Sequence, residues 1–236
     1  MSDPGHDEAA YTVQLEFRTA QSFLVAYSVN LSRGGVFLET DQDIPVGART
    51  NVALGVPGAQ PIELVGVVTF RRGDDSPDGP PGLGIELQDV TPLGAVVDLL
   101  VPTFRGVQVL VLSGDRQDRT TLARSIKSII STAEIMQAAD ANVAGNLMTS
   151  EVDLAVIDID FDTEGGLAML RAARAIDPPV PTVAITASPK MRELARLEGA
   201  NEIATNPPPF AELQVVLVRA LSKPMQIASA GPAIAG

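Results

Sequence analysis

Short apolar runs separated by turn residues fill the first part of the chain. Gly, Pro, Ser and Asp stand between the runs, in segments such as SRGG and RRGDDSPDGPPG. Many short strands joined by turns of this kind are typical of a small antiparallel barrel or sandwich. Thr91 and Pro92 then predict a helix that runs to about Leu100, with Thr91 as its N-cap. The runs predict strands at residues 11–17, 23–29, 35–40, 50–56, 61–70 and 82–87.

From Gly106 onward the pattern changes to alternating strands and helices. The first strand, VQVLVL, is apolar throughout, as is usual for strands that are buried on both faces of a parallel sheet. Repeated strand–helix units predict a doubly wound α/β fold with helices on both faces of the sheet. The predicted strands are 107–112, 133–138, 153–158, 181–187 and 201–205, and the predicted helices are 120–130, 142–150, 167–176, 190–197 and 210–221.

The change of pattern divides the 236 residues into two predicted domains. The all-β domain spans residues 10–101 and the α/β domain spans residues 106–222, while residues 1–9 and 224–236 are expected to form flexible tails. Residues 1–101 hold five arginines, no lysine and fourteen acidic residues, a net charge of −9, whereas residues 102–236 carry only −3. The β domain is therefore the strongly acidic one.

Composition excludes several classes of function. The chain has no cysteine and one histidine, His6, which argues against disulfides, thiol catalysis, histidine-based triads and Cys/His metal sites. A net charge of −12 and a pI of about 4.4 oppose binding to nucleic acid. No basic-then-apolar leader and no long apolar window is present. We expect a cytoplasmic protein that is not an enzyme, has no catalytic or metal-binding residues, and does not insert into membranes.

The string Asn30-Leu31-Ser32-Arg33-Gly34-Gly35 is the most informative motif of the β domain. On a strand, Asn30 and Ser32 would share one face, and the two glycines would allow a close backbone approach. Such a patch could hold a flat hydrogen-bonding ligand. The same residues also suit an ordinary hairpin, in which the polar side chains satisfy turn backbone groups.

The ordered segments NLSRGGVFLET, IPVGARTNVALGVPG, IELVGVVTF and PPGLGIEL resemble the PilZ domain, in the variant common in myxobacteria. This resemblance implies a six-stranded barrel with a C-terminal helix and, in many members, binding of cyclic di-GMP. Asn30, Ser32 and Gly35 match the family's [Asp/Asn]-x-Ser-x-x-Gly motif. The resemblance also suggests a protein that controls motility, polarity or development.

The second PilZ ligand motif, an Arg-x-x-x-Arg segment before the first strand, is missing. No Lys or Arg precedes Arg18, and Gln14 stands where a partner arginine would be needed. Cyclic di-GMP is a dianion that guanidinium groups bind by bidentate hydrogen bonds and by stacking. Arg33 and Arg18 could supply some of this attraction, but we expect weak or absent binding and hence no cofactor.

The α/β domain resembles a response-regulator receiver. In that family an acidic pair holds Mg²⁺, an Asp is phosphorylated, and a Ser/Thr and a Lys contact the phosphoryl group. Asp158 matches the phosphoacceptor and Thr186 the hydroxyl, but Ser113 and Gly114 replace the acidic pair and Asn206 replaces the lysine. Phosphoryl transfer needs cations near the equatorial oxygens. We therefore expect a pseudo-receiver in which Asp158 and Thr186 are inactive.

Three functions follow as alternatives. The first is a non-enzymatic signalling adaptor that acts through protein partners, with the segment Asn206–Phe210 and the acidic loop Asp74–Asp78 as possible docking elements. The second is a cyclic di-GMP receptor that binds through Asn30, Ser32, Arg33 and Arg18. The third is a phosphorylation-dependent response regulator.

Overall fold

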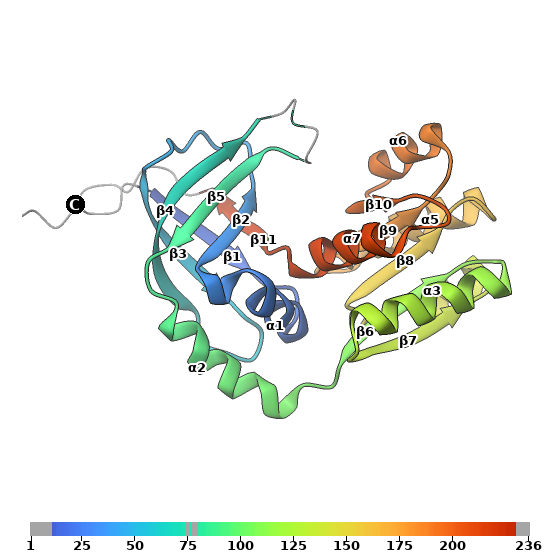
Figure 1. Cartoon of the computed structure of the whole chain (residues 1–236), viewed down its shortest axis with the longest axis horizontal. Helices are drawn as coiled ribbons and strands as arrows, with labels where there is room; N and C mark the ends of the chain where they lie inside the picture. The colour runs from blue at the N-terminus through green and yellow to red at the C-terminus, as the bar shows by residue number, and fades with distance from the viewer. Residues whose placement is uncertain (1–10, 74–75, 77–79, 230–236) are drawn as a thin grey trace, which may run out of the picture. The chain divides into compact units, whose positions relative to one another are not determined.

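The computed structural model describes residues 11–73, 76 and 80–229 (Figure 1). The chain divides into two compact units, one formed by residues 1–104 and 223–236 and the other by residues 105–222. The predicted tail at residues 1–9 and most of the predicted acidic loop at 74–78 lie outside the described residues. The second unit is inserted between two parts of the first, so the chain crosses between the units twice.

The first unit contains a mixed six-stranded sheet in the order β11-β1-β3-β4-β5-β2. Strands β1 and β3 run parallel, and the remaining neighbours are antiparallel. Alternate residues of the strands face a core that contains Val13, Val52 and Ile85. Five of the strands lie where the apolar runs predicted them. The strands are β1 (Tyr11–Glu16), β2 (Gly35–Glu39), β3 (Arg49–Gly55), β4 (Ile62–Arg72), β5 (Gly82–Leu87) and β11 (Met225–Ser229).

The predicted strand at residues 23–29 is wrong, because this segment belongs to helix α1 (Ala20–Val29). Thr19 and Ser22 form a capping box, in which the side chain of each residue accepts a hydrogen bond from the backbone N–H of the other, both at 3.1 Å. Phe23 and Ala26 are buried against the core, and the ring of Phe23 meets Phe17 edge-on. The cap and the burial of one helix face outweigh the β propensity of the run.

The predicted flexible tail at 224–236 is wrong for its first part, because Met225–Ser229 forms strand β11. This strand pairs antiparallel with β1, and the ladder joins Val13 to Ser229 and Glu16 to Met225. Without it, β1 would be an edge strand whose backbone groups face no partner on that side. The small-residue composition suggested fraying, but backbone pairing does not depend on large side chains.

The ends of the strand order are β11 and β2, so the described ladder is open rather than a closed barrel. An ion pair between Lys223, two residues before β11, and Glu39, at the end of β2, connects the two edges at one end. Helix α2 (Thr91–Leu100) buries Leu93 and Leu100 in the same core. It begins as predicted and has Pro92 in its first turn, although its N-cap is Val90 rather than Thr91. Two short 3₁₀ turns, η1 (Leu31–Arg33) and η2 (Val101–Thr103), complete the unit.

The second unit is a five-stranded parallel sheet in the order β10-β9-β8-β6-β7, as the alternating pattern predicted. This is the flavodoxin-like order of doubly wound folds, in which ligands bind beyond the carboxyl ends of the strands. The strands are β6 (Val107–Leu112), β7 (Ala133–Ala138), β8 (Leu154–Asp158), β9 (Thr182–Ile185) and β10 (Glu202–Ala204).

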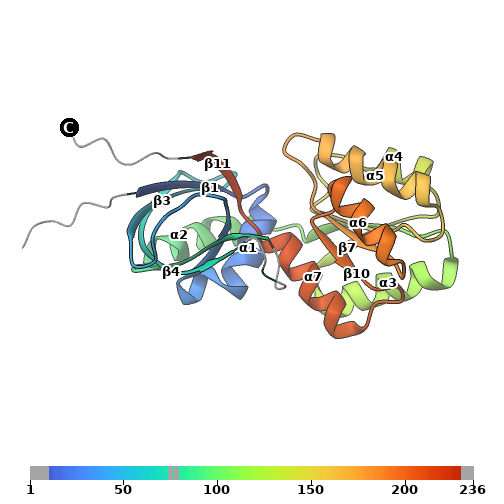
Figure 2. The same cartoon turned by 90° about the horizontal axis from the view of Figure 1, so that it is seen from above.

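Helices cover both faces of this sheet (Figure 2). Helices α4, α5 and α6 share one apolar cluster on one face, and α3 and α7 contact each other on the opposite face. The helices are α3 (Arg116–Ile129), α4 (Ala141–Leu147), α5 (Thr163–Ala175), α6 (Pro189–Leu197) and α7 (Phe210–Ser222). No helix within the described residues is both long and apolar enough to span a bilayer.

Candidate functional site

The Asn30–Gly35 motif forms a tight turn between α1 and β2. Asn30 ends the helix, and its carbonyl accepts hydrogen bonds from the N–H groups of Arg33 (3.0 Å) and Gly35 (3.2 Å). Gly34 has φ +81°, and a Cβ there would lie 3.2 Å from the carbonyl oxygen of Leu87. A residue with a side chain would be strained at this position, so Gly34 is needed for the turn itself.

The expected sharing of one strand face by Asn30 and Ser32 is wrong, because both lie in helical turns rather than on a strand. The turn nevertheless leaves Asn30, Ser32 and Arg33 exposed. Arg18 is different: it lies beyond the end of β1 and is only 8% exposed. The two arginines that could attract a dinucleotide therefore do not share an exposed surface.

Asp158 lies at the carboxyl end of β8 and is 5% exposed. Its carboxylate accepts hydrogen bonds from the Ser113 hydroxyl (3.0 Å), the Asp160 N–H (3.0 Å) and the Asn206 side-chain amide (3.4 Å). Burial raises the pKa of Asp158, and the charges of Asp160 and Asp118 raise it further against the opposing effect of the hydrogen bonds. Since the three donors are neutral, none offsets the charge as a lysine would.

Asp160, two residues further on, accepts as many hydrogen bonds as Asp158. It accepts hydrogen bonds from the Thr186 hydroxyl (2.5 Å), the Ala187 N–H (2.8 Å) and the Asn206 amide (3.1 Å). Burial alone would raise the pKa of Asp160, but these hydrogen bonds outweigh it and hold the pKa below its usual value. One carboxylate thus joins the loops that follow β8, β9 and β10.

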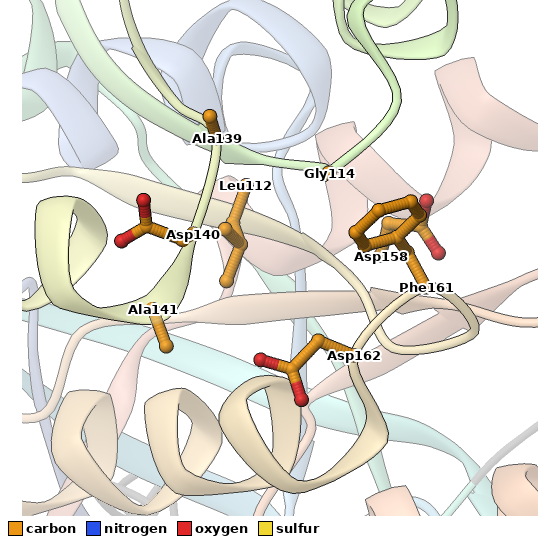
Figure 3. A pocket seen from close by; sticks show the side chains of 8 residues that line it. All are labelled: Leu112, Gly114, Ala139, Asp140, Ala141, Asp158, Phe161 and Asp162. Atoms are coloured by element: carbon orange, nitrogen blue, oxygen red, sulfur yellow. The ribbon is translucent and has the colours of Figure 1, made fainter.

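A small pocket lies beside Asp158, between the ends of β6 and β8 and the starts of α4 and α5 (Figure 3). The Phe161 ring covers Gly114, where a Cβ would come within 1.9 Å of the ring. Asp140 and Asp162, which also line the pocket, each cap a helix by accepting a backbone N–H. Within the described ranges, no group of three or more His, Cys, Asp or Glu residues is arranged to hold a metal ion. The full lining is Leu112, Gly114, Ala139, Asp140, Ala141, Asp158, Phe161 and Asp162.

Part of the first unit matches a known protein family. Residues 8–100 match the family model of the PilZ domain. The match covers the Asn30–Gly35 motif, strands β1 to β5 and helix α2, and ends before the second unit. Strand β11 lies outside the matched residues, so this sheet pairs a strand from beyond the second unit with strand β1 of the matched region.

Similar solved structures include several response-regulator proteins. One is the signal receiver domain of a DNA-binding response regulator from Colwellia psychrerythraea 34H, with 16% identity, 50% of this chain and 99% of that chain covered, and a TM-score of 0.45. Another is the receiver domain of the Francisella response regulator 1452 (22% identity, 49% and 96% covered, TM-score 0.43). A third is the chemotaxis protein CheY4 of Vibrio cholerae (19% identity, 49% and 98% covered, TM-score 0.43). Comparison with curated proteins gives no match.

The receiver resemblance assigned Asp158, Thr186, Ser113 and Asn206 to one site, and the structure brings all four together. It did not identify Asp160, which accepts three hydrogen bonds at this edge of the sheet. The sequence did contain a signal for Asp160. It comes two residues after Asp158, the aspartate that ends a buried strand. Phe210, at the end of the predicted docking segment, is 51% exposed and starts α7.

Proposed function

We propose that this chain is a non-enzymatic signalling adaptor, in which a PilZ domain and a receiver-like unit act through protein contacts rather than through phosphotransfer. The position of Asp160 supports this proposal most strongly. The receiver resemblance assigns Thr186 and the position of Asn206 to phosphoryl binding. Both side chains already donate to the Asp160 carboxylate.

A phosphoryl group on Asp158 would have to displace Asp160 from these donors. It would also add negative charge beside a second carboxylate, and the donors to both carboxylates are neutral groups. Phosphoryl transfer depends on cations that stabilise the charge developing on the equatorial oxygens. The side chains around Asp158 therefore favour an unmodified aspartate.

The PilZ domain supports a role in cyclic di-GMP-related signalling, and the details of its motif favour protein contacts over tight nucleotide binding. Arg18 is buried, and the unit around it is strongly acidic. One observation favours the alternative receptor function, because Asn30, Ser32 and Arg33 are exposed together on one turn. By resemblance to its family, the adaptor would act in motility, polarity or development.

Two titrations of the full chain test this proposal. Beryllofluoride with Mg²⁺, followed by backbone amide NMR, should leave the signals of Thr186 and Ala187 unchanged. Cyclic di-GMP, followed by calorimetry, should give no binding at micromolar concentrations. Shifts confined to the Asp158 site would support the response-regulator alternative. Micromolar or tighter nucleotide binding that Ser32→Ala abolishes would support the receptor alternative.

A further inference from the structure

One carboxylate joins three loops of the second unit. Asp160 lies in the loop after β8, and its donors are Thr186 and Ala187 in the loop after β9 and Asn206 in the loop after β10. The Thr186 hydroxyl donates to Oδ1 of the carboxylate, whereas the Ala187 N–H and the Asn206 amide donate to Oδ2. The donors follow Asp160 by 26, 27 and 46 residues, so these contacts fix the loops to one another rather than shape a single turn.

The three donors form a site that suits an anionic group. Thr186 is fully buried, so its hydroxyl must have its partners within the protein. Its oxygen accepts the Ser188 N–H at 3.1 Å, which leaves the hydroxyl proton for the carboxylate. Against the raising effect of burial, the donated hydrogen bonds hold the pKa of Asp160 below its usual value, so the charged form is favoured. The chain therefore fills an anion site with a group of its own.

Further hydrogen bonds connect this site to the first turns of α6 and α7. Ser188 caps α6, because its hydroxyl accepts a backbone N–H of the first turn, and its own N–H donates to Thr186. Thr205, which precedes Asn206, donates its N–H (2.9 Å) and its hydroxyl (2.5 Å) to the carboxylate of Glu212 in the first turn of α7. Each of the two loops is thus held at the site on one side and at the helix that follows it on the other.

The attachment of this carboxylate to the chain makes it difficult to displace. Asp160 follows Asp158 by two residues, and its N–H donates to the Asp158 carboxylate at 3.0 Å. Asp158 is itself held by hydrogen bonds from Ser113 and Asn206. A group that is tethered beside its binding site has a high effective concentration, so a free anion competes with it at a disadvantage.

We propose that Asp160 is a built-in ligand that holds the loops after β9 and β10 in one arrangement at all times. A site that is always occupied has no unoccupied state, so an external ligand cannot shift the population between two states. The starts of α6 and α7 are therefore presented to a partner protein in one fixed geometry, without any phosphorylation. Phe210, the first residue of α7, belongs to the surface that is fixed in this way and is 51% exposed.

This inference rests on the proposed adaptor function and deepens it, because it states how the receiver-like unit is regulated. The two fail separately. The beryllofluoride and cyclic di-GMP titrations test the wild-type chain for binding of a phosphoryl analogue and of a nucleotide, whereas the loop dynamics of Asp160 variants test the built-in ligand. A chain that binds neither compound, and whose loops do not depend on Asp160, would remain an adaptor without a built-in ligand.

The test is amide hydrogen exchange of the full-length chain, followed residue by residue with NMR. Asp160→Ala should lower the protection factors of the Ser188 and Thr205 N–H groups by about tenfold or more, as expected when hydrogen bonds to a charged group are lost. The acceptors of these two N–H groups remain in place, so a decrease shows that the loops themselves have loosened. Asp160→Asn, which keeps the size of the side chain, should have a smaller effect in the same direction. The amides of β6 report global unfolding and should change less.

Two controls accompany this measurement. Asp162→Ala removes a carboxylate from the same loop that accepts the Gly165 N–H of α5, and it should leave the protection of Ser188 and Thr205 unchanged. Sodium formate supplies a free carboxylate of the size that Asp160→Ala removes. It should restore protection in that variant, whereas sodium chloride at the same concentration should not.

Several results would overturn the proposal. These are unchanged protection of Ser188 and Thr205 in both Asp160 variants, an equal loss in the amides of β6, an equal loss in Asp162→Ala, and no greater recovery with formate than with chloride. A loss confined to the Ala187 N–H would also contradict it, because this group donates directly to Asp160 and reports only its own hydrogen bond.

Discussion

Replacing Asp160 by alanine should destabilise the second unit by about 1–2 kcal/mol at neutral pH. The substitution removes the acceptor of three donors. The Ala187 N–H and the Asn206 amide can donate to water instead. Thr186 is fully buried, so its hydroxyl cannot reach water. Hydrogen bonds to charged groups contribute roughly 1.5–3 kcal/mol each, and a buried group left without its partner costs about 1–3 kcal/mol. Relief of repulsion with Asp158 offsets part of this loss.

The assay is urea denaturation of the full chain, followed by circular dichroism and fitted with one transition for each unit. Glu151→Gln, which removes one exposed negative charge from the same unit, is the matched control and should change the free energy of unfolding by less than about 0.5 kcal/mol. Thr186→Val removes the donor instead. In a double-mutant cycle, Asp160→Ala and Thr186→Val should show a coupling of about 1 kcal/mol or more.

The effect of Asp160 should also depend on pH. Its folded pKa is lowered, so its contribution to stability is present above the unfolded pKa of about 3.9 and is lost as the pH falls through the lower folded value. The difference between wild type and Asp160→Ala should therefore be constant near neutral pH and shrink below about pH 4. A variant as stable as wild type at pH 7, with no coupling to Thr186, would refute the reasoning.

The remaining predictions concern burial and pairing. Asp158→Asn should raise the urea midpoint of the second unit at pH 7. The folded pKa of Asp158 is raised, so the ionised carboxylate costs stability. This cost is absent below the unfolded pKa and is fully present once the pH has risen through the folded pKa. An unchanged midpoint would contradict the prediction. Thr50→Val should stabilise the first unit by about 1 kcal/mol, since its buried hydroxyl has no partner among the described residues. Thr182→Val removes a hydroxyl that is hydrogen-bonded and should therefore destabilise the second unit. A chain ending at Pro224 keeps Lys223 but loses the ladder between β1 and β11, and its first unit should melt at a lower temperature.

The sequence predicted every strand and helix of the second unit, although α3 and α5 begin four residues earlier than predicted. The inner strands β6, β8 and β9 were clear because each is a short, mostly apolar run. It was less successful for the first unit. The run at 23–29 is rich in residues that favour strands, and only the Thr19–Ser22 capping box marks it as a helix. That box joins residues three apart and lacks the usual acidic partner.

The C-terminal strand could not be predicted from local composition. Met225–Ser229 pairs with β1, which lies more than two hundred residues earlier in the sequence. Such a long-range pairing depends on the path of the chain after the second unit. The local sequence pattern does not indicate that path. The same limit applies to the bulge at Thr69, since the apolar run at 61–70 predicts a strand but not the shift of its pairing with β5.

The sequence predicted which residues form the candidate site but not the hydrogen bonds between them. Asp158, Thr186 and Asn206 follow three different strands, and parallel strands bring such positions to one edge of a sheet. Which carboxylate receives the donors depends on the path of the loop after β8. In the structure Thr186 and Ala187 donate to Asp160, so Asp160 rather than Asp158 holds the donors from the loop after β9.

Intact-mass measurement after incubation with acetyl phosphate and Mg²⁺ tests the central claim most directly. Asp160 holds the donors that a phosphoryl group would need, and the donors to Asp158 are neutral. We therefore expect the full chain to keep its unmodified mass, as Asp158→Asn does under the same conditions. A phosphoryl adduct on the wild-type chain that is absent from Asp158→Asn would contradict the account.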